Sequence, residues 1–342
     1  MRINGNVIGA NNRPTSNTAN GVWRWDASTM HRLYNQFPTY TTPPEVPSST
    51  QAQGSTSGYT SGGTNRLTPT AQRSNVIDKF PFASNANASD VGDLTSARYQ
   101  IYAGQSSSSS GYASGGRTPA DNFSNVIDKF PFASGGNATD VGDLSQGRYS
   151  ASGQTSPSNG YTSGGYIAPS INTIDKFPFA SNANATDVGD LSRITSFNAG
   201  QSSSTNGYAS GGADNVIDKF PFASDANATD VGDLTAVRSG TAGQNSNVNG
   251  YTSGGTPGQT NVIDKFPFAS NANATDVGDL TVSRSSIGGG TSSTTAGYTA
   301  GGYISIPTLS NVIDKFPFAS DANASDVGDL TQVRYSSAGQ QV

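Results

Sequence analysis

Short groups of apolar and aromatic residues alternate with polar, glycine-rich stretches along most of the chain, and the same arrangement returns six times. Each unit begins with a Gly-Tyr-x-x-Gly-Gly element, first at Gly58, and continues to an Ile-Asp-Lys-Phe-Pro-Phe-Ala segment, first at Ile77. An Asn-Ala-Ser/Thr-Asp stretch, a Val-Gly-Asp-Leu segment and Ala-Gly-Gln then follow in most units. Successive units start 43 to 53 residues apart. Self-similarity at a fixed period of this size indicates a repeat architecture.

A unit of this length has room for four short strands joined by turns. We expect the first at Gly-Tyr-x-x-Gly-Gly, the second at Asn-Val-Ile-Asp-Lys-Phe-Pro-Phe, the third at Val-Gly-Asp-Leu-Thr and the fourth from the Arg to Ala-Gly-Gln. The Asn-Ala-Thr-Asp stretch is typical of a turn, because Asn and Asp side chains bond their own backbone. Since Pro has no N–H to donate, the second strand should bulge at its Pro or lie at a blade edge.

Six units of four strands predict an all-β, six-bladed β-propeller over residues 51–342, because radial closure hides most sheet edges. The chain ends with Ala338 to Val342, which repeat the strand that opens a further unit. The first unit has only a degenerate version of that strand, Gln51 to Ser57. We therefore expect the C-terminal strand to pair with the first blade and close the ring.

Composition leaves disorder as an alternative, since only 33% of residues are hydrophobic and 13% are charged. However, the chain has 15 Phe and 14 Tyr, most of them at fixed repeat positions, and a formal net charge of only −5. Disordered chains are usually poor in aromatic residues and rich in net charge. The pattern therefore favours a folded domain.

The chemistry of the repeats is that of a scaffold. The chain has no Cys and a single His, His31, so disulfides and thiolate metal sites are excluded and the usual general base is missing from the repeats. Each repeat carries three Asp, but an active site occurs once, and the extra acids Asp121 and Asp214 have no His or Cys companion. We expect no catalytic residue. Asp78, Lys79 and Arg98, with their counterparts, should pair and cap between neighbouring blades.

Ligands of other classes are also not expected. Asp225 to Asp233 offer closely spaced oxygens that could form a calcium loop, but Asx turns explain the same residues, so calcium stays an alternative to no cofactor and no metal. Evenly spread charge argues against nucleic acid, which requires clustered Lys and Arg. No apolar run is long enough to span a membrane, and no signal peptide is evident.

Differences between the repeats concentrate in one connection, from the Gly-Gly pair to the second strand, which has 2 to 11 residues. The other connection, from Gly-Gln to Gly-Tyr, is nearly all Ser, Thr and Asn. Alternate connections lie on opposite faces, so one face should be chemically varied and should contact a partner or a glycan. The candidate residues for this contact are Arg66, Arg73, Arg117, Phe123, Tyr166 and Tyr303. The alternative is that both faces carry only solvated loops.

Residues 1–50 break the repeat and contain both Trp of the chain. Asp26 to Asn35 could form one short helix capped by Asp26, and Pro38 to Pro47 are typical of a semi-rigid linker. Aromatic residues with Arg on an otherwise polar segment indicate a docking surface. We predict an anchoring segment with Trp23, Arg24 and Trp25 at the contact; the alternative is a tail packed on the propeller.

The repeat resembles kelch propellers. Gly58-Tyr59-x-x-Gly62-Gly63, the Ile77-Asp78-Lys79-Phe80 strand and Arg98 stand where the kelch pattern has a double glycine after an aromatic strand, a hydrophobic strand and an Arg-led strand. The kelch Trp is absent, with Val91 in its place. The third repeat has Ile194 where the others have Arg. This resemblance implies a fold and says little about function.

The chain also resembles repeat proteins of marine bacteriophages, through the Ile-Asp-Lys-Phe-Pro-Phe-Ala repeat and the Asn20-Gly21-Val22-Trp23 opening. The resemblance implies a virion structural protein, tail- or fibre-associated and used in host attachment, with residues 1–50 bound to other virion proteins and the propeller facing a host surface glycan or protein. Virions assemble in the host cytoplasm, which fits the lack of Cys and of a signal peptide. The alternatives are a secreted or surface-exposed lectin-like propeller and an intracellular kelch-type scaffold.

Overall fold

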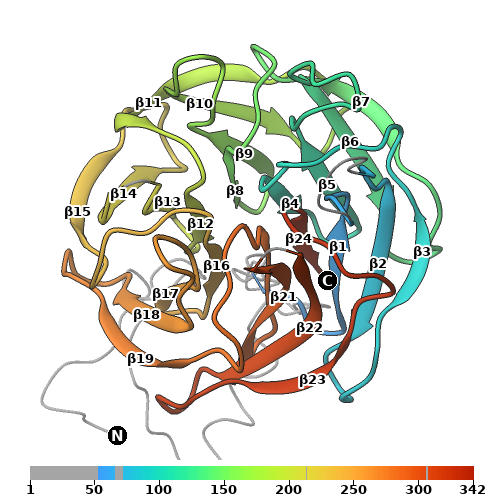
Figure 1. Ribbon diagram of the computed structural model, residues 1–342. Helices are drawn as coiled ribbons and strands as arrows, with labels where there is room; N and C mark the ends of the chain where they lie inside the picture. Colours follow the sequence, from blue (N-terminus) through green and yellow to red (C-terminus); the bar gives the residue numbers. More distant parts are fainter. Residues whose placement is uncertain (1–52, 66–71, 213, 306) are drawn as a thin grey trace, which may run out of the picture. The chain divides into compact units, whose positions relative to one another are not determined.

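A computed structural model describes residues 53–65, 72–212, 214–305 and 307–342. The described residues form a ring of six four-stranded antiparallel sheets, here called blades 1 to 6 (Figure 1). None of these residues is helical. The predicted anchor with Trp23, Arg24 and Trp25, the predicted helix and the linker lie outside the described residues, as does Arg66. The predicted all-β, six-bladed propeller is confirmed.

Within each blade the strands run from the axis to the rim in chain order, except in blade 1, whose innermost strand is the last of the chain. Blade 1 contains β24 (Ala338–Gln341), β1 (Ser57–Ser61), β2 (Val76–Pro81) and β3 (Ser89–Asp93). Blade 2 contains β4 (Gly104–Ser106), β5 (Ser110–Ser114), β6 (Val126–Pro131) and β7 (Thr139–Asp143). Blade 3 contains β8 (Ser152–Thr155), β9 (Asn159–Ser163), β10 (Ile171–Pro178) and β11 (Thr186–Thr195).

The remaining three blades repeat this order. Blade 4 contains β12 (Ala199–Ser202), β13 (Asn206–Ser210), β14 (Val216–Pro221) and β15 (Thr229–Asp233). Blade 5 contains β16 (Ala242–Asn245), β17 (Asn249–Ser253), β18 (Val262–Pro267) and β19 (Thr275–Asp279). Blade 6 contains β20 (Gly289–Ser292), β21 (Ala296–Ser305), β22 (Thr308–Pro317) and β23 (Ser325–Asp329).

Ring closure occurs as the sequence predicts. Strand β24 pairs antiparallel with β1, with Thr60 opposite Gly339 and Tyr59 opposite Gln340. The backbone of Val342 adds hydrogen bonds with Ser57. The first blade is therefore built from both ends of the propeller sequence.

The Pro of the second strand is placed differently from one of our expectations. Strand β2 is interior, between β1 and β3, so the blade-edge position is wrong. Pro81 ends β2, beyond the last pair with β3, which joins Lys79 to Ser89, so its missing N–H leaves no gap in that ladder. The bulge of this strand lies instead between Ile77 and Asp78.

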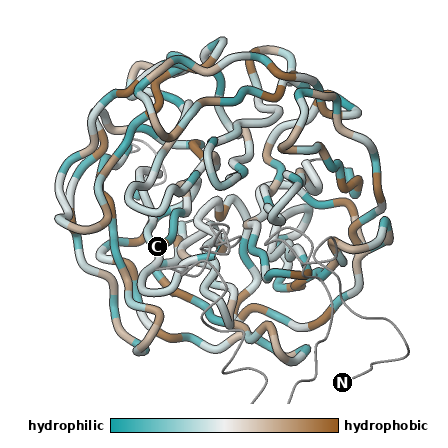
Figure 2. Tube along the Cα trace, turned by 180° about the vertical axis from the view of Figure 1, so that it is seen from behind, coloured by the Kyte–Doolittle hydropathy of each residue, from teal (hydrophilic) through white to brown (hydrophobic). Residues whose placement is uncertain are grey.

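The hydrophobic core consists of separate clusters between neighbouring blades. In the first interface, Tyr59 of blade 1 packs on Phe132 and Phe130 of blade 2, with ring centroids 4.8 and 5.7 Å apart. The other interfaces contain equivalent Tyr and Phe contacts. Figure 2 shows the hydrophobic segments in an annulus away from the axis. Burial of apolar surface therefore holds blade to blade.

Each interface also contains an Arg–Asp ion pair, which is buried in five interfaces and partly buried at Arg193. In the first, Arg98 Nη2 lies 2.5 Å from Asp128 Oδ2, and both side chains are fully buried. Arg98 also donates to the carbonyl of Gly115, and Asp128 accepts two hydrogen bonds from Thr95. Burial lowers the pKa of Arg98, and Asp128 opposes that shift. The six pairs are Arg98–Asp128, Arg148–Asp175, Arg193–Asp218, Arg238–Asp264, Arg284–Asp314 and Arg334–Asp78. The predicted pairing between blades is confirmed for Arg and Asp.

The lysines behave less uniformly. Lys79 remains in its own blade, with Nζ 5.6 Å from the ring centroid of Tyr59. Lys176 crosses to the next blade and pairs with Asp225 at 2.5 Å, as Lys265 does with Asp321. The prediction of pairing between blades therefore holds only for some of the lysines.

The third repeat keeps its arginine, contrary to the expectation that Ile194 replaces it. Strand β11 continues to Thr195, so side chains alternate and Ile194 points outward with 61% of its surface exposed. Arg193, one residue earlier, reaches the Asp218 carboxylate at 2.7 Å and also pairs with Asp214. The extra acid Asp214 is thus a partner of this displaced arginine.

Candidate functional site

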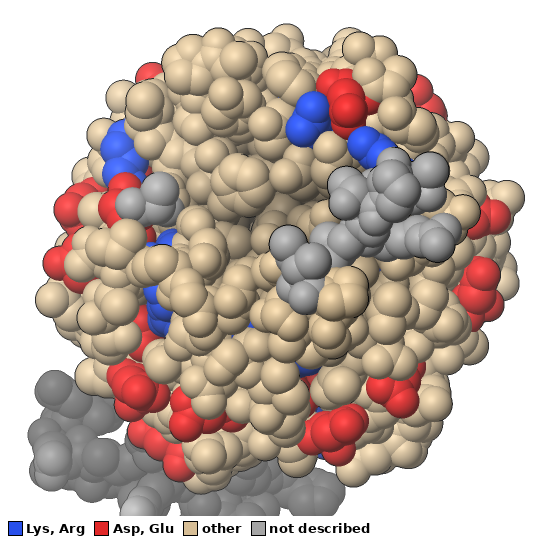
Figure 3. Space-filling model, viewed as in Figure 1, with Lys and Arg blue, Asp and Glu red and all other residues tan. Residues whose placement is uncertain are grey.

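The two faces of the propeller are built from different connections. On one face, the Ser-rich turns are fixed by their own side chains: Ser107 Oγ accepts from the backbone N–H of Ser110, and Ser156 Oγ does the same for Asn159. Equivalent bonds form at Ser203, Ser246 and Ser293. This face therefore carries the same turn in five blades. The opposite face, here called the variable face and seen in Figures 1 and 3, carries the connections of differing length.

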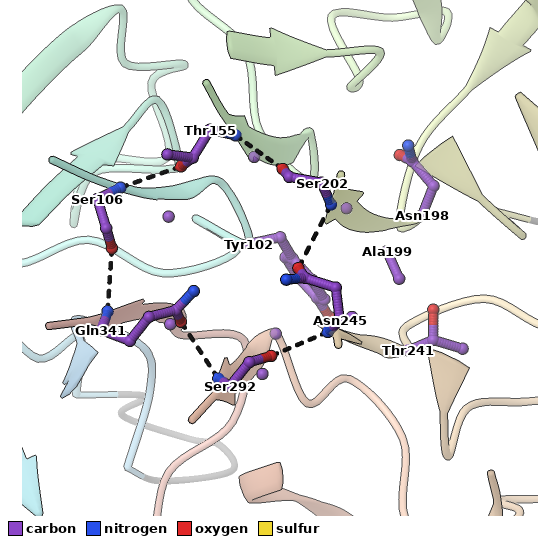
Figure 4. A pocket seen from close by; sticks show the side chains of 17 residues that line it. Tyr102, Ser106, Thr155, Asn198, Ala199, Ser202, Thr241, Asn245, Ser292 and Gln341 are labelled. Carbon is purple, nitrogen blue, oxygen red and sulfur yellow. Dashed lines mark hydrogen bonds between the residues drawn. The ribbon is translucent and has the colours of Figure 1, made fainter. Parts of the chain in front are cut away.

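The axis is nearly filled by backbone. A Cβ on Gly104 would lie 2.1 Å from the carbonyl oxygen of Gly339, and the glycines at this level in every blade are packed in the same way. Backbone N–H groups of one innermost strand donate to side chains of the next, which closes a ring of six hydrogen bonds around the axis (Figure 4). The remaining cavity has a volume of about 40 Å³, enough for only about three water molecules.

Tyr102 limits access to this cavity further. Its side chain is 6% exposed, lines the cavity, and places Oη 3.2 Å from Oγ of Ser336. Burial raises its pKa to about 12. Its ring meets that of Phe197 edge to face at 5.9 Å. A ligand larger than a few water molecules must therefore bind outside the axis.

On the variable face, aromatic and arginine side chains converge between blades 1 and 3. Arg117 lies with its guanidinium carbon 5.0 Å from the ring centroid of Tyr149, 5.6 Å from that of Tyr99 and 5.9 Å from that of Phe123. The guanidinium carbon of Arg73 lies 4.7 Å from the Tyr99 centroid. We call this group, together with Asp121 and Tyr166, the Arg117 patch.

One carboxylate serves both arginines of the patch. Asp121 Oδ1 accepts a hydrogen bond of 2.9 Å from Arg73 Nη2 and one of 3.1 Å from Tyr99 Oη. Nη2 of Arg117 lies 3.6 Å from the same oxygen. The hydrogen bonds from Tyr99 and Arg73 lower the pKa of Asp121. Burial, followed by the hydrogen bond to Asp121, raises the pKa of Tyr99.

A line of aromatic rings continues from the patch toward the axis. Tyr149 is 5.2 Å from Phe123 and 5.1 Å from Tyr166, measured between ring centroids. Phe197 is 6.4 Å from Tyr149, and it contacts Tyr102. Phe123 is the most exposed of these, at 37%.

The structure brings together most, but not all, of the predicted loop residues. Arg73, Arg117, Phe123 and Tyr166 belong to the patch. Tyr303 does not: its ring is 6.3 Å from that of Tyr335, at the boundary of blades 6 and 1.

Sequence reasoning missed Tyr99 and Tyr149, which complete the patch. Each follows a buried interblade arginine and forms a backbone bridge to the residue after the next Gly-Gly pair, Arg117 and Tyr166 respectively. In blade 5 the same two positions hold Ser239 and Thr256. The residue after the arginine varies between repeats, and that variation was the available signal.

The oxygens considered for calcium have separate partners. Asp225 pairs with Lys176, Asn227 Oδ1 accepts from the backbone N–H of Asp190, and Asp230 Oδ1 accepts from that of Gly232. In the described part of the chain, no three His, Cys, Asp or Glu side chains are grouped in a way that could hold a metal ion. No helix in the same residues is long and apolar enough to cross a membrane.

No protein-family model and no curated protein matches this chain.

Proposed function

We propose that the protein is a non-enzymatic binding protein in which a rigid propeller presents the Arg117 patch to a partner. The observation that carries this proposal is where the repeats differ. The blade interfaces repeat the same aromatic contacts and the same ion pair. The aromatic and charged residues that differ from repeat to repeat, in contrast, lie together on the variable face. Function on a rigid scaffold is usually carried by its loops, and surface Tyr, Phe and Arg are enriched where proteins bind partners.

The repeated carboxylates support a role without catalysis. Asp78 and its five counterparts are each engaged by a buried or partly buried arginine. The outer Asp90 accepts a hydrogen bond from the backbone of Gly92. An acid or base needs an accessible position next to substrate, and these groups are occupied in the scaffold.

At a finer level, the protein is a bacteriophage virion component, tail- or fibre-associated, that serves in host attachment. This rests on the resemblance of its repeat and of its Asn20-Gly21-Val22-Trp23 opening to marine phage proteins, and the kelch likeness of the repeat adds only a fold. In this proposal residues 1–50, with Trp23, Arg24 and Trp25 at the contact, hold the chain on the particle. The propeller then presents its variable face to the host.

Particle composition tests the virion assignment. Purified particles should contain the protein by mass spectrometry, and a full-length Trp23→Ala/Trp25→Ala variant should be produced in soluble form but be lost from particles. A Tyr303→Ala variant is the matched aromatic control and should be incorporated normally. If purified particles lack the wild-type protein, the virion assignment is wrong.

Cell binding tests the function of the patch separately. Full-length protein should bind host cells, and Arg117→Ala/Tyr149→Ala should reduce that binding. Thr256→Ala/Ser239→Ala changes the same two backbone positions in blade 5 and should leave binding unchanged. Equal binding by all three proteins would place the contact elsewhere.

One observation favours the alternative, a secreted or surface-exposed lectin-like propeller. The line of rings formed by Phe123, Tyr149 and Tyr166 offers apolar faces beside hydroxyl groups, a combination suited to sugars. A protein found in culture supernatant and on producing cells, and absent from particles, would support this alternative.

A further inference from the structure

Arg117 is held in place without using its hydrogen-bond donors. Three aromatic rings surround its guanidinium, the Asp121 carboxylate lies 3.6 Å away, and Nε is buried. Its guanidinium donates no hydrogen bond to any of the residues that the structure describes. The Arg117 side chain is 26% exposed, so the unused Nη donors of its guanidinium can take an acceptor from outside.

The charge balance of the patch indicates the charge that such an acceptor should carry. Two guanidinium groups, Arg73 and Arg117, face the single carboxylate of Asp121, which hydrogen-bonds to Arg73. One positive charge is left over, and it resides on the arginine whose donors are free. Because the guanidinium fork matches an anionic oxygen pair, the missing partner is an anion bound by charge-assisted hydrogen bonds.

The rest of the face favours a sparsely charged molecule over a polyanion. Among the described residues, Arg193 of β11 faces two carboxylates, Asp214 and Asp218, and so leaves no spare positive charge; acidic side chains line the rim in Figure 3. Within the part of the chain that the structure describes, a polymer with one anion per unit would find the excess positive charge of the Arg117 patch and an acidic surface around it. An isolated anionic group on an otherwise neutral molecule fits better.

The side chains beside Arg117 indicate what the neutral part of the ligand should be. Phe123 exposes 37% of its surface beside Arg117, and Tyr149 and Tyr166 continue the apolar faces with hydroxyl groups next to them. The patch is open, and the axis admits only a few water molecules. Ring faces and hydroxyl groups on an open surface match the apolar faces and hydroxyl groups of a pyranose chain.

We infer that the Arg117 patch binds a saccharide that carries an isolated carboxylate, with the carboxylate on Arg117 and a sugar ring against Phe123. The inference rests on the proposed function, since it names the ligand class of the same patch. Asp121 and Tyr99 act as positioning residues, because they fix the arginines without needing to touch the sugar.

The test measures binding of two probes with one carboxylate each, sialyllactose and aldotriouronic acid, against their carboxyl-reduced forms, with full-length protein and saturation-transfer NMR. Wild type should bind the acidic forms at least about tenfold more tightly, as expected for a charge-assisted hydrogen bond. Added salt should weaken only the acidic forms.

The variants separate the two halves of the site. Arg117→Ala should remove the preference for the acidic form, and Arg117→Lys should retain part of it as a point charge. Phe123→Ser should weaken both forms, and Thr256→Ala should match wild type. An unchanged melting temperature shows that a variant is folded. If Arg117→Ala does not fold, Phe123→Ser still tests the site, because its side chain is exposed.

Several outcomes would overturn the ligand class. These are equal affinity for acidic and reduced forms, an unaffected Arg117→Ala variant, or no transfer from wild type to either acidic probe. Inorganic phosphate that competes as well as the acidic probes would reduce the site to a simple anion site. Cell binding that survives periodate oxidation of the cell glycans but not protease treatment would make the occupant a protein. In each case particle incorporation and cell binding report separately whether the proposed function still stands.

Discussion

Arginine serves opposite purposes in two regions of the molecule. At the blade interfaces, Arg98 is fully buried, and its two Nη groups donate to Asp128 and to the carbonyls of Gly115 and Val126. In the Arg117 patch, the side chain is 26% exposed, and its guanidinium lies against aromatic rings and donates to none of the described residues. The first arrangement uses both Nη groups of the arginine inside the protein and fixes the scaffold. The second holds the arginine in position and leaves it able to bind.

The same comparison applies to aromatic residues. Tyr59 and its counterparts are buried at blade interfaces, whereas Phe123 and Tyr149 meet at the surface. Apolar area removed from water stabilises the fold, whereas area left exposed can be buried only by a partner. Changes at the interfaces should therefore alter mainly stability, and changes in the patch should alter mainly binding.

The largest effect should come from removing the closing strand. Deleting residues 338–342 exposes the edge of β1 and removes the hydrogen bond from Gln340 to the carbonyl of Tyr112. The melting temperature measured by calorimetry should fall by more than about 10 °C, and the protein should tend to aggregate. Adding a synthetic peptide of residues 335–342 should restore part of the loss. An unchanged melting temperature would show that closure does not stabilise the ring.

Breaking one buried pair should have the next largest effect. Arg98→Ala leaves the Asp128 carboxylate buried beside Thr95 alone, so the free energy of unfolding measured in urea should fall by about 3–5 kcal/mol. Replacing both partners, as Arg98→Met/Asp128→Leu, should cost much less, because no unpaired charge remains. A single substitution that costs no more than the double one would contradict this view of the interface.

One interface lacks a hydrogen-bond network that the other five contain. In blade 2, Gln105 Nε2 donates to the carbonyl of Tyr161 and to Ser114 Oγ. Blade 6 has Thr291 and Ala300 at these two positions, and Thr60 Oγ1 and Thr291 Oγ1 are buried there without a partner. The interface of blades 6 and 1 is thus the one where a hydrogen-bond network can be added.

Installing the missing network tests this difference. Thr291→Gln/Ala300→Ser should raise the free energy of unfolding by about 1 kcal/mol, the net value of a typical buried hydrogen bond. The reverse pair in blade 2, Gln105→Thr/Ser114→Ala, should lower it by a similar amount. A destabilised Thr291→Gln/Ala300→Ser protein would mean that the space is too small for the amide.

The smallest effect concerns pH at the patch. Hydrogen bonds from Tyr99 and Arg73 lower the pKa of Asp121 in the folded protein. Its stabilising contribution is therefore present above the ordinary Asp pKa of about 3.9 and is lost as pH falls through the lower folded value. An NMR titration should find the Asp121 carboxyl below about 3.9, and Asp121→Asn should remove only this pH dependence. A titration at or above that value would contradict the hydrogen-bonded geometry.

The sequence alone determined the blade number, the strand content and the closure. The blade number and strand content follow from a local pattern that is repeated six times, namely the Gly-Gly pair and the Ile-Asp-Lys-Phe strand. The closure follows from the additional strand sequence that begins at Ala338. It also predicted which face carries chemical variety. Repetition makes such inferences strong, because each strand must fit the same environment in every blade.

Only the tertiary structure decided which side chains meet. Arg193 replaces the expected arginine because β11 continues through Thr195 and alternation turns Ile194 outward, a register that spacing in the sequence does not reveal. Tyr99 and Tyr149 join the patch because the residue after each buried arginine bridges to the next blade's loop, while Tyr303 falls beside Tyr335. Such contacts join residues that are distant in the chain, so their geometry is set by blade packing and not by any local pattern.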